Sequence, residues 1–295
     1  MRTLAPAKIN WMLEVLGKRE DGYHEIRSVM QTIDLRDELS AELSDSPVFE
    51  TARDEPLADD DLIVRAARAL EGRVGRALPV RIRVKKRIPV ASGLGGGSSD
   101  AAAVLRLLNR LHQLELSDEE LATVGAAVGS DVPFFVYGGT ALVEGKGEQV
   151  RPLSHVAETW LVVLVLPIDV PRKTAKAYES LTTEDFTDGE RTSQMVDCLN
   201  KQEKVPAASL YNSFDCTKPG INPATSVYAG LSQYKAALMR AGALGVHLAG
   251  AGPGLFTLVR DRRDGQRISR NLPPNIRVYV ARTLTAREAT VIVSE

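Results

Sequence analysis

A glycine-rich loop between a strand pattern and a helix pattern is the feature of this sequence that most constrains its fold. Over 80–85, apolar and basic residues alternate with the period of a half-buried strand. From Ala101 to Leu111, apolar residues recur at helical spacing. The loop between them reads Gly93-Leu94-Gly95-Gly96-Gly97-Ser98-Ser99-Asp100. It therefore ends at the N-terminus of a helix.

Such a loop can bind an anion. Four glycines in five positions remove the Cβ atoms that would keep backbone N–H groups away from a ligand. The helix N-terminus adds unpaired N–H groups and the positive end of the macrodipole. We interpret the loop as a phosphate site for a nucleoside triphosphate; the alternative is a flexible turn in which Ser98, Ser99 or Asp100 caps the helix.

The two common nucleotide motifs are absent. No lysine follows the glycines, so the loop is not a Walker loop. The nearest match to that pattern surrounds Gly145-Lys146, but its spacer is one residue too long. Nor is the loop a Rossmann fingerprint, because Ser98 occupies the position of the third glycine.

Composition excludes several classes of protein. The chain has 295 residues, of which 44% are apolar, which predicts one large or two ordinary domains with a substantial core. A net charge of −1 argues against a general nucleic-acid or membrane-surface role. No apolar run approaches the roughly 20 residues that span a bilayer, and the N-terminus lacks an apolar signal core. Cys198 and Cys216 are expected to be reduced thiols, so the predicted location is the cytoplasm.

Mixed strand and helix patterns predict α+β architecture in both halves of the chain. A boundary is expected near 151–158, giving domains 1–155 and 156–295. Ser117 and Glu120 have the spacing of a helix capping box. Strands are expected at 7–15, 28–39, 134–137, 140–144, 160–166, 246–248, 255–259 and 276–280. Helices are expected at 62–70, 117–128, 228–239 and 264–270, and loops at 44–61 and 182–192.

Two charged residues lie in apolar surroundings. Asp131, in the segment 129–135, is a candidate to accept the proton of an alcohol that attacks the triphosphate, as a kinase requires. Its alternative role is to cap a helix. Lys8 stands between Ala7 and Ile9 and, if it lies near Asp131, could keep that carboxylate ionised and lower the pKa of the reacting hydroxyl. Otherwise it is a strand lysine that points into solvent.

Two further motifs could contact a nucleotide. Gly22-Tyr23-His24 combines an aromatic ring with a hydrogen-bonding ring, which can stack on and read a flat base. The alternative is a surface turn. A second glycine cluster, 249–254, follows a strand pattern and could bring backbone close to the nucleotide, or form a plain hairpin connection.

Taken together and in this order, these motifs resemble those of the GHMP kinase superfamily. The likeness covers nearly the whole chain, and its pairing of the Lys8 motif with Tyr23-His24 is closest to the branch that phosphorylates a cytidine-diphosphate-linked methylerythritol in non-mevalonate isoprenoid biosynthesis. Its strongest parts are Pro6-Ala7-Lys8-Ile9-Asn10, Asp21-Gly22-Tyr23-His24, Ile88-Pro89 with Gly93 to Ala102, and Gly129-Ser130-Asp131-Val132-Pro133-Phe134-Phe135.

The resemblance implies an α+β fold of two domains with a cleft between them. The N-terminal domain would resemble domain 2 of ribosomal protein S5, and the C-terminal domain would be ferredoxin-like. ATP would be the co-substrate, with Mg²⁺ bridging its phosphate oxygens and Ser98 or Ser99 in reach of the ion or a phosphate. The partner would be the cytidine-diphosphate-linked small molecule, with no nucleic acid or membrane partner, and the protein a monomer or weak homodimer.

The resemblance also implies site residues. Lys8 and Asp131 would form the catalytic pair, with Asp131 taking the proton of the 2-hydroxyl as it attacks the γ-phosphorus directly. The substrate would be bound by Asn10, Tyr23, His24, Thr174 and Tyr178, with Tyr178 covering the cytosine opposite Tyr23. Ala249 and Ala251 replace serines that are usual in the family. The ATP phosphates would be wrapped by Pro89, Val90, Ala91, Ser92, Gly93, Leu94, Gly95, Gly96, Gly97, Ser98 and Ser99.

Two alternatives stay open. The first is another kinase of the superfamily, acting on a mevalonate-type alcohol, homoserine or a sugar. Tyr23 and His24 argue against it, because those substrates carry no base. The second is a non-catalytic relative that only binds nucleotide, against which the intact Lys8 and Asp131 argue.

Overall fold

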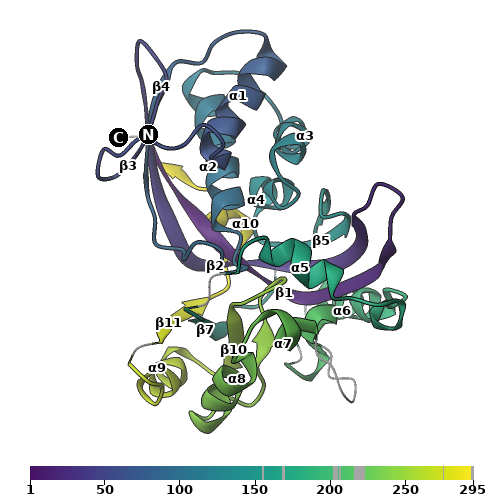
Figure 1. The fold of residues 1–295 in the computed structure, drawn as a ribbon. Helices are drawn as coiled ribbons and strands as arrows, with labels where there is room; N and C mark the ends of the chain where they lie inside the picture. The colour runs from purple at the N-terminus through teal and green to yellow at the C-terminus, as the bar shows by residue number, and fades with distance from the viewer. Residues whose placement is uncertain are drawn as a thin grey trace.

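Two β-sheets, each covered by helices, form the protein (Figure 1). The computed structural model describes residues 1–154, 156–167, 170–201, 205, 207–215, 223–274 and 276–293. Within these residues, one sheet has eight strands and the other has four. No helix in these ranges is long and apolar enough to cross a membrane. The mixed helix and sheet content agrees with the predicted α+β class.

A long antiparallel hairpin is the centre of the eight-stranded sheet. It consists of β1 (Arg2–Lys18) and β2 (His24–Leu43), whose register shifts at three irregularities, one of them between Asn10 and Met12. β1 is buried over most of its length, as expected for a strand covered on both faces. The other strands of this sheet are β3 (Val48–Thr51), β4 (Val80–Lys85), β5 (Thr140–Gly145), β6 (Gln149–Pro152), β8 (Tyr211–Asn212) and β12 (Ile292–Val293).

Four helices pack together beside this sheet and carry its core. α2 (Gly96–Leu111) contacts the other three helices as well as β1 and β2. A run of alanines keeps its first turns narrow, so the helix lies close to the sheet and residues 99–108 are all buried. The neighbours of α2 are α1 (Leu62–Val74), α3 (Asp118–Val128) and α4 (Val132–Tyr137).

The four-stranded sheet is antiparallel, in the order β11 (Arg277–Arg282), β7 (Trp160–Val165), β10 (Leu255–Val259), β9 (His247–Leu248). β7 is central and apolar, as its sequence predicted. The helices of this half are α5 (Lys173–Glu179), α6 (Glu190–Asn200), α7 (Pro223–Val227), α8 (Leu231–Arg240) and α9 (Arg262–Arg270), followed by α10 (Ala286–Ala289). Three short 3₁₀ segments lie at Thr183–Asp185, Ala207–Ser209 and Ser213–Asp215.

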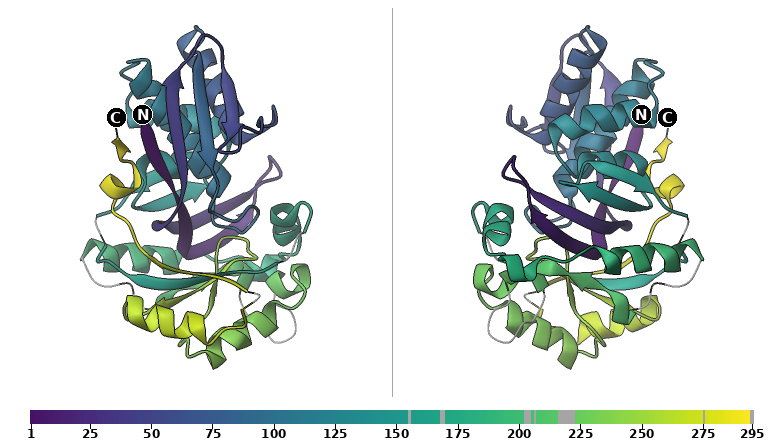
Figure 2. Two further views of the ribbon diagram at one scale, coloured as in Figure 1. Left: turned by 90° about the vertical axis from the view of Figure 1, so that its left-hand side faces the viewer. Right: turned by 90° about the vertical axis from the view of Figure 1, so that its right-hand side faces the viewer.

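The chain returns to the first sheet at its end. β12, the last described strand, pairs with the start of β1 and lies beside it in both side views (Figure 2). β8 also pairs with β1, although it lies far beyond residue 156 in the sequence. The division into domains 1–155 and 156–295 stays a prediction, and these two strands show that sequence position alone does not assign a strand to its sheet.

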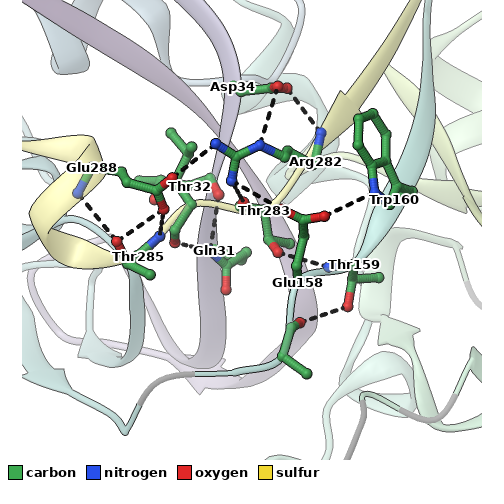
Figure 3. A network of polar contacts seen from close by, with 12 residues as sticks. Gln31, Thr32, Asp34, Glu158, Thr159, Trp160, Arg282, Thr283, Thr285 and Glu288 are labelled. Carbon is green, nitrogen blue, oxygen red and sulfur yellow. Dashed lines mark hydrogen bonds and ion pairs between the residues drawn. The ribbon is translucent and has the colours of Figure 1, made fainter. Parts of the chain in front are cut away.

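A polar network fixes the crossing between the two sheets (Figure 3). The Arg282 guanidinium lies 3.2 Å from Glu158, 2.8 Å from Glu288 and 3.9 Å from Asp34 of β2. Beside it, the Thr283 N–H donates to the Thr159 carbonyl at 3.0 Å, and the Thr159 N–H donates to the Thr283 hydroxyl at 2.9 Å. Among these contacts, the Arg282–Asp34 pair joins the second half of the chain to β2.

One predicted strand is wrong. Phe134–Tyr137 is part of α4 and not a strand. A buried aromatic run has no period that separates a strand from a buried helix, and Pro133 favours the first turn of a helix. Three smaller differences are that β3 lies within 44–61, that α6 begins at Glu190 inside the predicted loop, and that α8 begins only at Leu231. The Ser117 and Glu120 capping box is confirmed.

Candidate active site

A cavity of about 1330 Å³ receives side chains from both halves of the chain. β1 contributes Lys8 and Asn10 to the cavity, and the glycine loop lines it as well. Asp131 enters the cavity from the turn before α4. The second half contributes residues of α5, together with Gly250 and Ala251 of the glycine turn. The cavity therefore contains most of the residues that the sequence motifs singled out.

Lys8 and Asp131 lie together within it. Lys8 is only 4% exposed, so it does not point into solvent. Its Nζ lies 3.7 Å from Oδ2 of Asp131 and donates a 2.9 Å hydrogen bond to Oδ1 of Asn10. Asn10 in turn donates to the Ser28 hydroxyl of β2 at 2.8 Å. Two strands thus fix the ammonium group beside the carboxylate.

Asp131 is not used as a helix cap. It stands at the N-cap position of α4, but its side chain makes no capping hydrogen bond there. Its carboxylate is partly exposed to the cavity and its charge acts on the Lys173 ammonium and the Tyr178 hydroxyl. The arrangement leaves Asp131 oxygen atoms for a ligand.

The glycine loop lies against β1 and begins α2. The Lys8 N–H donates to the Leu94 carbonyl at 2.9 Å. Gly95 is the N-cap of α2 with φ +74°, and no side chain caps the helix, so the capping alternative for this loop is wrong. A Cβ atom on Gly95 would approach the Phe135 ring to 2.7 Å. The first N–H groups of α2 are therefore left for a ligand.

Most of the eleven predicted loop residues line the cavity. The two exceptions are Leu94 and Ser99, which are fully buried and do not line it. Among the described residues the Ser99 hydroxyl has no hydrogen-bond partner, whereas Ser98 faces the cavity. Those that line it are Pro89, Val90, Ala91, Ser92, Gly93, Gly95, Gly96, Gly97 and Ser98.

A buried charged cluster holds the start of the loop. The Asp37 carboxylate accepts the N–H groups of Arg87 and Ile88, the latter at 2.8 Å. Lys86 lies between Asp37 and Asp100, and pairs with both. Burial raises the pKa of Asp100, although the Lys86 charge opposes this effect. The cluster joins β2, the loop and α2, and the motif analysis did not identify it.

The two glycine clusters touch each other. The Gly254 N–H donates to the Ser92 carbonyl at 2.9 Å. A Cβ atom on Gly93 would lie 2.4 Å from the Ala249 carbonyl oxygen, and one on Gly254 would lie 2.6 Å from that of Ser92. Glycine is required here because backbone meets backbone. We call this contact between residues 92–93 and 249–254 the glycine seam.

Aromatic rings gather at another part of the cavity. His24 stacks on Tyr178 with ring centroids 4.9 Å apart, and the Phe186 ring meets His24 edge-on at 6.1 Å. Tyr23 is 57% exposed, and Nζ of Lys146 lies 4.6 Å from the centre of its ring. Tyr178 therefore contacts the His24 ring, and a role for it in covering cytosine stays a prediction.

Electrostatics keeps His24 neutral near physiological pH. Burial lowers the pKa of His24 from its ordinary value of 6.5, and the Lys18 charge adds to the effect. A neutral imidazole offers one donor and one acceptor. Burial also raises the pKa of Tyr178, so its hydroxyl stays protonated. Thr174 is exposed on α5 and lines the same cavity.

Sequence reasoning did not assign a role to several residues that line the cavity, four of which matter for its chemistry. Lys86, Lys146 and Lys173 are lysines in unremarkable local sequence, and Phe186 lies in a stretch that read as a polar loop. In the sequence, Lys146 stands out only as part of an imperfect Walker pattern. Its position after a glycine at the end of β5 was a signal, since turns beside strand ends often carry function. Cys216 lies outside the described residues.

A glycine loop at a helix N-terminus, beside an ammonium and a carboxylate in one cleft, defines the class of small-molecule phosphotransferases. Comparison with known families agrees with this class. Residues 61–139 match the GHMP kinases N terminal domain, and residues 206–275 match the GHMP kinases C terminal domain. The chain belongs to the GHMP kinase family, whose members use ATP, and it is an ATP-dependent small-molecule kinase.

Individual relatives make the comparison finer. A 4-diphosphocytidyl-2-C-methyl-D-erythritol kinase of Dehalococcoides mccartyi is 41% identical over 91% of this chain and 93% of its own. One from Brevibacillus brevis is 38% identical over 98% of both chains. A crystal structure of 4-(cytidine 5'-diphospho)-2C-methyl-D-erythritol kinase superposes with a TM-score of 0.78 at 32% identity, covering 96% of this chain and 99% of the other.

More distant structures share the fold. A homoserine kinase from Cytophaga hutchinsonii has a TM-score of 0.71 at 19% identity, covering 97% of this chain and 94% of its own. The predicted GHMP-kinase-like fold is therefore confirmed.

Proposed function

We propose that this kinase transfers the γ-phosphoryl group of ATP to the 2-hydroxyl of 4-diphosphocytidyl-2-C-methyl-D-erythritol, in the non-mevalonate route to isoprenoid precursors. The observation that carries the proposal is that one cavity holds both the Lys8–Asp131 pair and the His24–Tyr178 ring pair. A mevalonate-type alcohol or homoserine has no flat base that would use those rings. The names of the relatives support the same substrate.

The Lys8–Asp131 pair supports direct transfer to the alcohol. Asp131 takes the proton of the 2-hydroxyl as its oxygen attacks the γ-phosphorus. A new phosphorus–oxygen bond forms, the bond to the bridging oxygen breaks, and ADP leaves. The Lys8 ammonium, 3.7 Å from Asp131, stabilises the negative charge that develops on the attacking oxygen. No side chain carries the phosphoryl group in this scheme.

The donor atoms of the cavity fit Mg²⁺ bound mainly through ATP. No group of three or more His, Cys, Asp or Glu residues that could hold a metal occurs in the part of the chain that the structure describes. Ser98 offers a hard hydroxyl oxygen to the cavity, and Mg²⁺ usually keeps phosphate oxygens and water among its ligands. Ser98 would contact the ion, which, when bound, would neutralise charge on the β- and γ-phosphates.

The aromatic part of the cavity suits the cytidine group. A neutral His24 can donate to and accept from the edge of cytosine, while Tyr23 and Phe186 offer ring surface for stacking. Lys146, beside Tyr23, is placed to meet the diphosphate. Asn10 and Thr174 line the cavity and offer polar groups for the methylerythritol hydroxyls.

One assay tests the substrate. ADP release is measured with 4-diphosphocytidyl-2-C-methyl-D-erythritol, mevalonate, homoserine and a sugar as acceptors. Turnover with the cytidyl compound alone is expected. Turnover with another acceptor and not with the cytidyl compound would establish a different kinase of the family, and ATP binding without turnover of any acceptor would establish a pure nucleotide binder.

The catalytic pair is tested by Asp131→Asn. Removal of a general base costs about 10²- to 10⁴-fold in rate, so kcat should fall by that factor while ATP binding is retained. Asp118→Asn, at the exposed first turn of α3, is the matched control and should leave kcat unchanged. A kcat for Asp131→Asn within a few-fold of the unmodified enzyme would exclude Asp131 as the base.

A further inference from the structure

Lys173 brings an additional ammonium group into the same cavity. It is the first residue of α5 and lines the cavity together with Lys8 and Asp131. Its Nζ donates a 2.6 Å hydrogen bond to the Gly252 carbonyl in the glycine seam. The neighbouring Gly250 also lines the cavity, so this ammonium lies where the seam borders the ligand space.

The charges around Lys173 leave it poorly compensated. Burial and, to a lesser extent, the positive charge of Lys8 lower the pKa of Lys173 to about 8, while the negative charge of Asp131 opposes this effect. Within the described chain, these are the charged groups from β1 and from the turn before α4 that act on it. Two ammonium groups thus share one carboxylate. Such a cavity favours a multiply charged anion, because the negative charges of a phosphate balance the positive charge that one carboxylate leaves unbalanced.

The hydrogen bond to Gly252 does not explain why a lysine is present. The same turn is held at Gly250 by an Asn212 amide that donates at 2.8 Å, and at Ala251 by the Tyr228 hydroxyl that donates at 2.7 Å. A third anchor that requires a partly buried charge adds cost where two neutral anchors already exist. The ammonium is therefore better explained by a ligand than by the fold.

We propose that Lys173 is a catalytic residue whose ammonium group contacts the transferring phosphoryl group and stabilises the charge on its oxygen atoms in the transition state. The inference rests on the proposed function, because it requires the γ-phosphate to lie between Lys8, Asp131 and the glycine seam. No bond to Lys173 forms or breaks; the contribution is electrostatic. Lys173 comes from the second half of the chain, so the reaction centre needs both halves.

The experiment compares kcat and kcat/KM for ATP between pH 6.5 and 10 in the full-length enzyme and three variants. kcat/KM reports groups of the free enzyme, so in the unmodified enzyme it should fall above pH about 8, where the Lys173 ammonium loses its proton. Lys173→Met should lower kcat at pH 7 by about 10²-fold, as for loss of one preorganised donor, and should abolish this alkaline fall. Lys173→Arg, which cannot lose its charge, should retain part of kcat and also lack the fall.

Lys176→Met is the matched control. Lys176 is exposed on the same helix and does not line the cavity, so its removal should change neither kcat nor the pH profile. Thermal unfolding of each variant, followed by circular dichroism, separates loss of chemistry from loss of fold.

Two results would overturn the proposal. One is a Lys173→Met enzyme with kcat within about threefold of the unmodified enzyme. The other is a variant that loses thermal stability and gains a higher KM for ATP while kcat and its alkaline fall persist, since that pattern belongs to a structural anchor. The comparison uses whichever alcohol is turned over, so a different acceptor would refute the substrate and leave Lys173 testable. If no alcohol is turned over, both proposals fall.

Discussion

Gly93→Ala tests the glycine seam on which the cavity depends. Gly93 has φ +85°, and a left-handed conformation costs an L-residue roughly 1–2 kcal/mol. The added Cβ would lie 2.4 Å from the Ala249 carbonyl oxygen and 3.0 Å from that of Gly252. Both contacts are with backbone, which cannot rotate away, and overpacking of this kind costs about 1–3 kcal/mol. The free energy of unfolding should therefore fall by about 2–5 kcal/mol.

Gly75→Ala is the matched control for the backbone conformation. Gly75 ends α1 with φ +68°, and nothing lies within 4 Å of an added Cβ. This variant has the conformational cost of a left-handed alanine but no clash. Replacing glycine by alanine also restricts the unfolded chain, which offsets roughly 0.4–1 kcal/mol of that cost. The difference between the two variants isolates the clash across the seam.

Thermal unfolding and ATP kinetics measure the two consequences. At about 2 °C per kcal/mol, Gly93→Ala should lower Tm by roughly 4–10 °C. Its KM for ATP should rise several-fold, because the loop and the turn are forced apart, whereas Gly75→Ala should leave KM unchanged. Equal Tm values for the two variants, with an unchanged KM for Gly93→Ala, would refute the close approach of the two backbones.

Three further predictions concern the edges of the site and the junction of the sheets. Phe186→Ala should raise KM for the cytidyl substrate at least several-fold with KM for ATP unchanged; an equal rise in both would argue against a contact with the base. The pKa of His24 is lowered below 6.5, so that substrate's KM should stay constant from pH 8 to 6.5 and rise only at lower pH. Arg282 lowers the pKa of Glu288 to about 2, below its ordinary 4.5, so the stability it adds is complete above pH 4.5 and is lost as pH falls through about 2. Glu288→Gln should therefore flatten the pH dependence of the free energy of unfolding, measured with urea, between pH 4.5 and about 2. An unchanged pH dependence would contradict the role of the Arg282–Glu288 pair.

Local sequence predicted the parts of the site that depend on local geometry. The glycine loop was recognisable because close backbone approach requires missing Cβ atoms, and the same requirement marked the turn at 249–254. Lys8 and Asp131 stood out because a charge in an apolar segment needs a partner. Their separation of 3.7 Å depends on how β1 meets the turn before α4, which the motifs alone do not specify.

Residues whose role depends on distant packing were not predictable. Nothing near Lys173 in the sequence indicates that it reaches the Gly252 carbonyl, because that contact joins α5 to a turn 79 positions later. Phe186 contacts His24 across an even longer stretch of chain. The α4 error has a similar origin. Phe134 and Phe135 are both fully buried, so their burial pattern resembles that of a central strand, and only the surrounding packing on α2 and α3 selects the helix.

The glycine seam also explains how Ala249 and Ala251 can stand where the family resemblance leads us to expect serine. Both residues act through their backbone. The Ala249 carbonyl meets Gly93, and the Ala251 carbonyl accepts the Tyr228 hydroxyl. Neither contact needs a side-chain oxygen, so the shape of the turn survives without the serines. Without serines the turn lacks a hydroxyl donor toward phosphate. The Lys173 ammonium, which is hydrogen-bonded to the same turn, supplies a stronger donor at that border of the cavity. A charge from α5 can therefore compensate for hydroxyl groups missing from the turn.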